Sequence, residues 1–376
     1  MKLTANVSDQ TYKVVVWATG RVGKLAIRAI ADRPNLELAG VWVHSQAKDG
    51  QDAGTLAGIQ PLGVAATCDS AAILDGDADC VFYTGPATSR PREAIEDFCT
   101  ILRSGKNVVT TSLPGLVYPR GSMRESALNR IAEAAKEGTS SIYSTGIEPG
   151  FGCDLFATAL TSMSNRVYSV RGLEITDYSR DYTVYEMREL FGFGQPMDYQ
   201  GGIKMPGVIR FGWGAAVTMV AESLGVELDE IRETCEFAPS PRLLQTASGV
   251  IEPGTVGAVW FRCIGVVDSQ EAITIEHVDR MADDVAPDWP KSRAGGTDGV
   301  WRVMIEGEPS FDAEFEVGFK PDEDATPHGL LATGMRAINA IPWVCAAEPG
   351  LLDALHIPIT SAVGALRPHR EGIPAF

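Results

Sequence analysis

One segment of the sequence has the glycine spacing of a phosphate-binding turn. Ala18-Thr-Gly-Arg-Val-Gly23 follows a short apolar run and precedes a segment with helical spacing. It matches the pattern G-x-G-x-x-G with alanine in the first position. Gly20 would let the backbone approach a pyrophosphate, and Gly23 would let the helix pack closely against the strand. The pattern predicts a dinucleotide site formed by Ala18, Thr19, Gly20, Arg21, Val22 and Gly23, with an ordinary strand-to-helix turn as the alternative.

The end of the second predicted strand bears on the choice of nucleotide. An NAD-binding domain usually has Asp or Glu there to bind the ribose hydroxyls, but residues 41–48 include no acid. Ser45 could bind a 2′-phosphate, and Arg21 and Lys48 could add positive charge. The alternative is that these side chains are solvated loop residues. We expect NADP as the cofactor, with NAD as the alternative, and nucleotide contacts from His44, Ser45 and Lys48.

Hydride transfer to a carbonyl or imine needs a cleft beside the nicotinamide and a group that stabilises the developing charge. In an open parallel sheet the cleft lies at the carboxyl ends of the strands. Residues that directly follow predicted strands should therefore line it. They are Thr84, Gly85, Pro86, Thr111, Ser112, Thr145 and Gly146.

Three residues are candidates for the catalytic chemistry. Glu148 follows the fifth predicted strand and could act as an acid or base or bind an ammonium group; otherwise it is an exposed loop carboxylate. Tyr178 ends a predicted strand and could donate a proton, although it could also be an interface residue. His277 shares a strand face with apolar residues, which is typical of a hydrogen-bonded core histidine. Asp279 belongs to a run of loop acids that could bind a cation or an amine, with a solvated loop as the favoured interpretation.

The elements that position these residues follow from the hydrophobic pattern. In residues 1–150, short apolar runs alternate with amphipathic helical segments, which predicts a doubly wound parallel sheet of the Rossmann type. Residues 151–326 contain neighbouring strands without intervening helices, which predicts an α+β domain with a mainly antiparallel sheet. A helix predicted at residues 330–346, which Pro342 should end or kink, places residues 327–376 back on the first domain. The fold class is therefore α/β with a second α+β domain.

Several segments resemble a known family. Residues 18–23 and Phe82-Tyr-Thr-Gly-Pro86 are similar to the N-terminal domain of dihydrodipicolinate reductase. Residues 105–111, 146–151 and 338–342 resemble the subgroup that includes 2,4-diaminopentanoate dehydrogenase and native amine dehydrogenases. The resemblance implies the fold, a nicotinamide cofactor and a dimer, and the last segment adds Asn339 as a candidate cofactor residue.

The sequence departs from this family at two places. The His-His-x-x-Lys stretch of dihydrodipicolinate reductase is missing, and residues 112–119 carry no carboxylate where amine dehydrogenases of the subgroup place a glutamate. We therefore expect an NAD(P)-dependent oxidoreductase that reduces a C=O or C=N bond of a small, partly apolar substrate. Reductive amination should be weak unless Glu148 supplies the carboxylate. The alternative is a non-catalytic NADP(H)-binding sensor.

Composition limits the partners. The 376-residue chain has 32 Lys and Arg against 49 Asp and Glu, a net charge of −17, which disfavours nucleic-acid binding. No apolar run reaches the length of a membrane span, and the polar N-terminus predicts a cytoplasmic protein. The seven cysteines and five histidines show no ligand spacing, so we expect no metal. The predicted sheet that contains the long apolar strand at residues 256–267 has one face to shield from water. The same sheet of a second chain could cover this face, which predicts a homodimer.

Overall fold

The computed structural model describes residues 10–181, 183–318 and 325–367. The chain divides into two compact units, and each is described by itself. Unit 1 contains residues 1–119, 123–146 and 330–376. Unit 2 contains residues 120–122 and 147–329.

Unit 1 is built on a parallel sheet. Its strand order is β15-β6-β5-β4-β1-β2-β3, and every pairing is parallel. The strands are short, and β1, β4, β5 and β6 are almost entirely buried, as expected of a sheet covered on both faces. They are β1 (Tyr12–Trp17), β2 (Leu36–Trp42), β3 (Ala66–Thr67), β4 (Cys80–Tyr83), β5 (Asn107–Thr110), β6 (Ser141–Ser144) and β15 (Gly350–Leu352).

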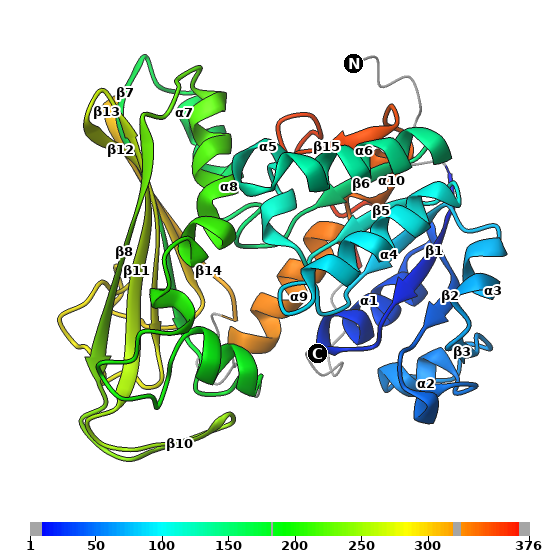
Figure 1. Cartoon of the computed structure of the whole chain (residues 1–376), viewed down its shortest axis with the longest axis horizontal. Coiled ribbons are helices and arrows are strands. Elements are labelled where there is room, and N and C mark those ends of the chain that lie inside the picture. Colours follow the sequence, from blue (N-terminus) through cyan, green and yellow to red (C-terminus); the bar gives the residue numbers. More distant parts are fainter. Residues whose placement is uncertain (1–9, 182, 319–324, 368–376) are drawn as a thin grey trace. The chain divides into compact units, whose positions relative to one another are not determined.

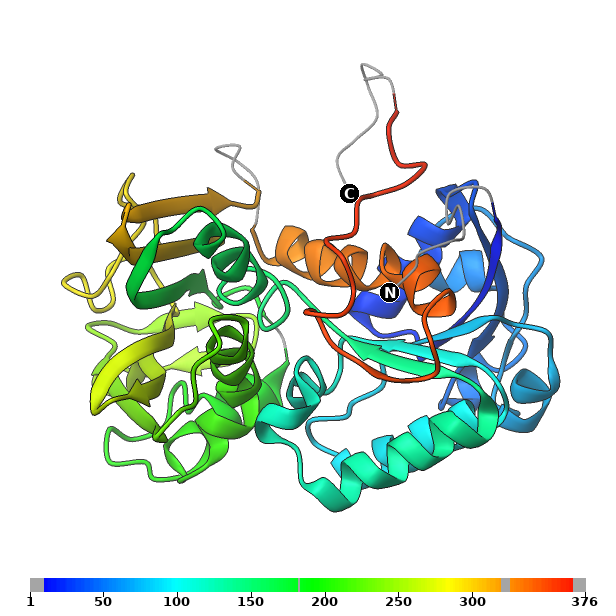
Figure 2. The ribbon, with the colours of Figure 1, turned by 90° about the horizontal axis from the view of Figure 1, so that it is seen from above.

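Helices cover both faces of this sheet, as Figures 1 and 2 show. On one face, α1 (Arg21–Asp32), α9 (Ala325–Ile338) and α10 (Ile341–Cys345) bury apolar side chains against the strands. On the other face, α4 (Pro91–Arg103) packs beside α6 (Glu125–Gly138), and Phe98 of α4 lies edge-on to Tyr83. Short helices complete the unit: α2 (Ala53–Ala57), α3 (Ser70–Asp75), η1 (Gln46–Lys48) and η2 (Pro114–Leu116).

Unit 2 is built on a six-stranded mixed sheet of order β14-β13-β7-β12-β11-β8. The β7–β12 pair is parallel, and the other pairs are antiparallel. The main strands are β7 (Arg166–Asp177), β8 (Glu230–Pro239), β11 (Val256–Val267), β12 (Gln270–Arg280), β13 (Val300–Glu308) and β14 (Phe311–Glu316). A small hairpin pairs β9 (Leu244–Thr246) with β10 (Gly249–Ile251), and the helices are α5 (Pro119–Ser122), α7 (Leu155–Thr161), η3 (Tyr185–Leu190), η4 (Gly202–Lys204) and α8 (Val208–Ser223).

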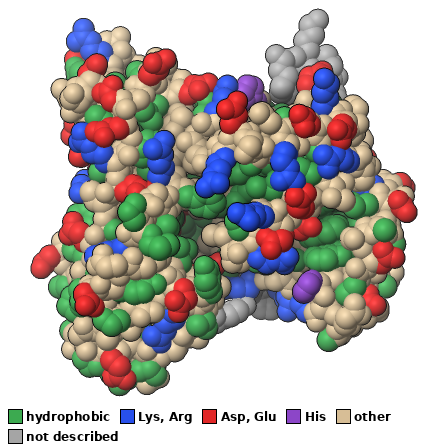
Figure 3. Space-filling model, viewed as in Figure 1, with side chains coloured by type: hydrophobic (Ala, Val, Ile, Leu, Met, Phe, Trp, Pro, Cys, Tyr) green, Lys and Arg blue, Asp and Glu red, His purple; other side chains and the backbone are tan. Residues whose placement is uncertain are grey.

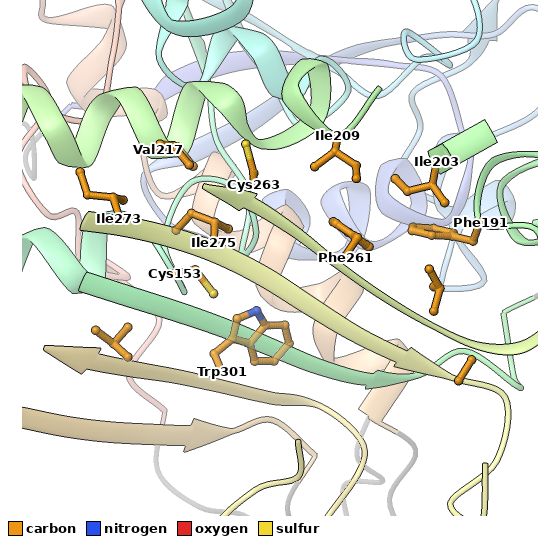
Figure 4. Close-up of a cluster of buried hydrophobic side chains, with 14 of the residues drawn as sticks. Cys153, Phe191, Ile203, Ile209, Val217, Phe261, Cys263, Ile273, Ile275 and Trp301 are labelled. Atoms are coloured by element: carbon orange, nitrogen blue, oxygen red, sulfur yellow. The ribbon is translucent and has the colours of Figure 1, made fainter. Parts of the chain in front are cut away.

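The main core of unit 2 lies between α8 and one face of the sheet. Figure 4 shows Val217 and Ile209 pointing from this side toward Phe261, Cys263 and Ile275 of the strands. Since side chains alternate across a strand, the residues of β12 that share this face have odd numbers. His277 and Asp279 therefore lie on the core side of the sheet.

The predicted fold class is confirmed, with local corrections. The helix predicted at 330–346 is interrupted: α9 ends at Ile338, and α10 begins at Ile341 with Pro342 in its first turn, where proline is tolerated. The parallel β7–β12 pair was not anticipated in a sheet predicted as mainly antiparallel. Strand β8 was missed because five of its ten residues are charged or threonine, with little apolar alternation.

The surface agrees with the charge balance. On the face drawn in Figure 3, Lys and Arg side chains are interspersed with Asp and Glu, so no continuous basic patch is visible there. In the part of the chain that the structure describes, no helix combines the length and hydropathy needed to cross a bilayer.

Candidate functional site

The predicted phosphate turn lies between β1 and α1. Gly20 is the N-cap of α1, so the free N–H groups of the first helical turn are available to an anion. Ala18 has a φ of 84°, a backbone conformation that favours glycine. This explains why the motif usually has glycine at the first position, since alanine here holds a strained conformation.

The two glycines of the turn serve different purposes. A Cβ atom at Gly23 would meet the Ala18 carbonyl oxygen at 2.1 Å, so glycine is required for the helix to pack against the turn. A Cβ atom at Gly20 would meet nothing within 4 Å, and Gly20 is exposed. The open space at Gly20 is therefore on the side from which a pyrophosphate would approach.

The other candidates from unit 1 follow strands at the carboxyl edge of the sheet. Thr84 donates from Oγ1 to the carbonyl oxygens of Trp17 and Ala18, each at 3.1 Å, which ties the end of β4 to the phosphate turn. Ser112 donates its backbone N–H to Thr110 Oγ1 at 3.0 Å. The remaining predicted residues are placed as follows: Thr111 is half-buried after β5, Gly85 is buried and Pro86 exposed after β4, and half-buried Asn339 follows α9.

The residues expected to choose the nucleotide also lie around this turn. His44 and Ser45 are exposed after β2. Lys48 donates from Nζ to Thr19 Oγ1 at 3.0 Å, so this lysine is held against the phosphate turn. Half-buried Arg21 and Val22 begin α1. Arg21 therefore belongs to the turn, and the Lys48 side chain contacts it.

In unit 2, a buried polar cluster surrounds Glu174. In the sheet register Glu174 lies opposite His277 of β12 on one side and Trp301 of β13 on the other. Its Oε1 lies 3.3 Å from His277 Nδ1, and its Oε2 accepts a hydrogen bond from Trp301 Nε1 at 2.8 Å. Thr176 Oγ1 donates to Oε1 at 3.3 Å. Both oxygens of Glu174 are thus occupied by neighbours in the sheet.

Two further carboxyl groups of unit 2 have unfilled hydrogen-bonding capacity. Asp279 is fully buried, and neither of its oxygens has a partner. Glu148 accepts the backbone N–H of Cys153 at 2.7 Å through Oε2, while its buried Oε1 has none. Burial, together with the negative charge of Glu174, raises the pKa of both groups well above the ordinary carboxyl range.

Tyr178 and His277 are both connected to this cluster. Burial and the nearby charges of Glu174 and Asp279 raise the pKa of Tyr178 well above its usual value, so Tyr178 keeps its proton. His277 stacks on Phe261 with ring centroids 4.8 Å apart and an interplanar angle of 9°. Its Nε2 is buried without a partner. Of the three predicted catalytic residues, His277 contacts Glu174 directly, whereas Glu148 and Tyr178 are linked to it through the effect of its charge on their pKa.

The acids from Asp279 onward do not form one loop cluster, which corrects the sequence interpretation. Asp279 belongs to β12 and is buried, whereas Asp283 and Asp284 follow the strand and are exposed. Asp284 forms a two-point pair with Arg242, and Asp283 accepts a hydrogen bond from Thr297. Exposed Asp288 lies further along the same loop.

Sequence reasoning missed Glu174 and misplaced Asp279. Glu174 lies between Leu173 and Ile175 in β7, and this signal could have identified it because a carboxylate among apolar residues is rarely fully buried unless it is paired. One ligand atom from each of Glu174, His277 and Asp279 lies within 4.8 Å of the others. The absence of a metal remains a prediction.

Comparisons with known proteins give a consistent picture. Residues 151–370 match the family described as 2,4-diaminopentanoate dehydrogenase C-terminal domain, and residues 12–113 match dihydrodipicolinate reductase, N-terminus. An amine dehydrogenase of Streptomyces virginiae is 40% identical over 354 residues, which cover 94% of this chain and 98% of that protein. A 2,4-diaminopentanoate dehydrogenase of Acetoanaerobium sticklandii is 23% identical over 72% of each chain.

Among solved structures, the amine dehydrogenase from Mycobacterium smegmatis has a TM-score of 0.74 at 20% identity. The match covers 95% of this chain and 98% of that one. This likeness concerns the fold, and the sequence matches carry the relationship. The resemblance noted in the sequence is thus confirmed over both units.

Proposed function

The chain belongs to the family of 2,4-diaminopentanoate dehydrogenases and amine dehydrogenases, NAD(P)-dependent oxidoreductases, and we propose that it interconverts a small, partly apolar amine with its carbonyl compound. In the reductive direction, NADPH would deliver a hydride to the carbon of a C=N bond, with a C=O bond as the second acceptor. NADH is the alternative cofactor. The unit 1 turn fits a dinucleotide, because the helix end at Gly20 is open and Lys48 is held beside it.

The observation that carries the proposal is a group of carboxyl side chains in unit 2 that lack a cationic partner. The negative charge of Glu174 acts on Glu148 and on Asp279, and among the described residues no Lys or Arg forms an ion pair with any of the three. Buried carboxylates are costly unless a cation or a proton compensates them. A substrate ammonium or iminium would supply this positive charge.

Glu148 is our candidate for the proton transfer. Because its pKa is raised, the protonated form of Glu148 is favoured, and this form can donate a proton. In the aminating direction, the proton would go to the hydroxyl of a carbinolamine, which leaves as water. The carboxylate that remains would balance the charge of the iminium formed in the same step. Glu148 would thus replace the glutamate that is missing from residues 112–119. Tyr178 and His277 are the alternative proton donors.

A non-catalytic sensor is the second candidate function, favoured by the missing glutamate at residues 112–119. Cofactor oxidation by a panel of small aldehydes and ketones, with and without ammonium, separates the two. Turnover supports the enzyme. Tight NADPH binding without any turnover supports the sensor.

For cofactor choice, we expect Arg21→Ala to weaken NADPH binding more than NADH binding. A charge-assisted contact to the 2′-phosphate typically contributes about 1.5–3 kcal/mol, roughly a 10-fold or larger change in the ratio of the two dissociation constants. Fluorescence titration of both cofactors measures this ratio. Lys24→Ala, which removes an exposed positive charge from the same helix, is the control and should leave the ratio unchanged. If Arg21→Ala weakened the binding of NADPH and NADH equally, Arg21 would not contact the 2′-phosphate.

We also propose that two chains pair through the outer face of the unit 2 sheet. This face carries a separate apolar cluster around Leu173 and Ile175, bordered by partly exposed Trp260 and Met304. Light scattering should give about twice the 40.2 kDa chain mass. Met304→Asp should shift the mass toward one chain. A native monomer at micromolar concentration would contradict this assembly.

A further inference from the structure

Asp154, Glu174, Glu148 and Asp279 differ in how many hydrogen bonds their carboxyl groups already accept. Asp154 accepts backbone N–H groups through both oxygens, from Gly150 at 2.7 Å and Leu155 at 2.6 Å, and so is a structural cap. Glu174 is likewise filled at both oxygens, and Glu148 is filled at one. Asp279 accepts none and is fully buried. Two buried acceptors without any donor are costly, so Asp279 is the group with the largest unmet demand.

His277 provides a third unfilled acceptor beside Asp279. The two residues are separated by one position on β12, so their side chains lie on the same face of the sheet. Because Nδ1 faces the Glu174 carboxylate at 3.3 Å, Nδ1 carries the proton in the neutral ring, and Nε2 presents a lone pair. Nε2 is buried without a partner. Glu174, held by Trp301, is thus a positioning residue that fixes the orientation and tautomer of His277.

Among the described residues, no Lys or Arg forms an ion pair with Asp279, although the nearby Arg280 charge opposes the larger effect of burial on the pKa of Asp279. Arg280 follows Asp279 directly, but its side chain donates to the carbonyl oxygens of Val285, Ala286 and Pro290 instead. Two aromatic rings close the site from other directions. Trp213 lies edge-on to the His277 ring with centroids 4.8 Å apart, and Phe261 stacks on the same ring. Both rings therefore pack against His277.

We infer that Asp279 and His277 form a binding subsite for a primary ammonium group, with the Asp279 carboxylate and His277 Nε2 each accepting one of its N–H donors. The inference rests on the proposed function for the identity of the nitrogen, which is that of the substrate amine or of ammonium itself. Neither residue occurs near residues 112–119, where the related enzymes place their glutamate.

Glu174 borders the same space as Asp279 and His277. One acceptor atom from each of these three residues lies within 4.8 Å of the others. Burial raises the pKa of Asp279 and so favours its protonated form. An arriving ammonium favours the carboxylate instead, and the displaced proton would pass to solvent. This explains how the subsite can exist without a permanent counter-charge.

The experiment measures binding and does not require turnover. The full chain, with NADP⁺ present, is titrated with methylammonium chloride at constant ionic strength while its melting temperature is recorded. A ligand that binds only the folded state raises this temperature in a saturable way. We expect this rise in the native protein, an affinity at least about 10-fold weaker in Asp279→Asn, and an unchanged affinity in Asp288→Asn, which makes the same charge change at an exposed site. Unchanged affinity in Asp279→Asn overturns the inference.

A second comparison uses only the native protein and therefore does not depend on the folding of a variant. Trimethylammonium has one N–H donor where methylammonium has three, so we expect it to bind at least about 10-fold more weakly. Equal affinities would overturn the subsite. Ammonium chloride in the same titration distinguishes the free ion from the substrate amine as the source of the nitrogen. Stabilisation by Zn²⁺ or Mg²⁺ that Asp279→Asn removes, with none by methylammonium, would identify a metal site instead.

These outcomes separate the subsite from the proposed reaction. Binding of methylammonium through Asp279 in a protein that turns over no amine or carbonyl would refute the proposed function and keep the subsite. Amine turnover with the same KM for ammonium in the native protein and in Asp279→Asn would keep the proposed function and refute the subsite.

Discussion

Gly20→Asp is expected to abolish NADPH binding while leaving the protein folded. The new carboxylate would occupy the open space at the N-terminus of α1 and would repel a pyrophosphate. Because a Cβ atom at Gly20 meets nothing within 4 Å and φ is −72°, the substitution should cost little stability. Titration of NADPH fluorescence should show at least a 100-fold loss of affinity. This loss corresponds to the free energy of one charge-assisted phosphate contact, about 3 kcal/mol.

The matched control is Gly76→Asp, which follows α3 and precedes β4, at the opposite edge of the same sheet. Its φ of −68° also suits an ordinary residue, and it adds the same charge to unit 1. We expect it to bind NADPH like the native protein. If Gly20→Asp bound NADPH normally, the cofactor would lie elsewhere, and the account of unit 1 would be wrong.

Glu148→Gln is expected to have the largest effect on turnover. Loss of a positioned acid or base typically costs ~10²–10⁴-fold in rate, and the amide cannot donate the proton that releases water. Melting temperature should be unchanged or higher, because the substitution removes a carboxyl group that is costly to ionise in its buried setting. Steady-state amination of a small ketone with NADPH and ammonium provides the measurement.

The pH dependence distinguishes a proton-transfer role from a structural one. Since the pKa of Glu148 is raised, its acid form persists above the ordinary carboxyl range and disappears as the pH rises through that raised pKa. Native amination should fall on this alkaline side, and the residual activity of Glu148→Gln should lack the same fall. A variant that keeps efficient amination with the native pH profile would assign the proton to another group, with Tyr178 and His277 as the next candidates.

Unit 1 was largely predictable from the sequence because its signals are local. Five of its parallel strands are short runs followed by a turn or helix pattern, so these strands and the residues at their carboxyl ends follow from general rules. The two-residue β3 and the three-residue β15 are too short to give such a pattern. The phosphate turn was predictable for the same reason, since its glycines lie within six residues. The strained backbone at Ala18 was not predictable, because alanine, unlike glycine, does not indicate a positive φ in the sequence.

The cluster in unit 2 could not be predicted as a cluster. Glu174 and His277 are about a hundred positions apart, and they meet only because β7 and β12 pair in parallel. Sequence patterns fix which face a residue occupies but not which strand lies beside it. Asp279 was misplaced for a related reason: three acids follow it within ten residues, so a buried strand end resembled a solvated loop.

The central claim is that this protein transfers a hydride between NADP(H) and the carbon of an amine or imine. The direct measurement incubates the purified chain with NADPH, a small aliphatic ketone and isotopically labelled ammonium, and follows cofactor oxidation and labelled amine together. We predict one labelled amine for each NADPH oxidised, and no oxidation with the Gly20→Asp variant. Tight NADPH binding with no cofactor oxidation across a panel of aldehydes and ketones, with or without ammonium, would contradict the claim.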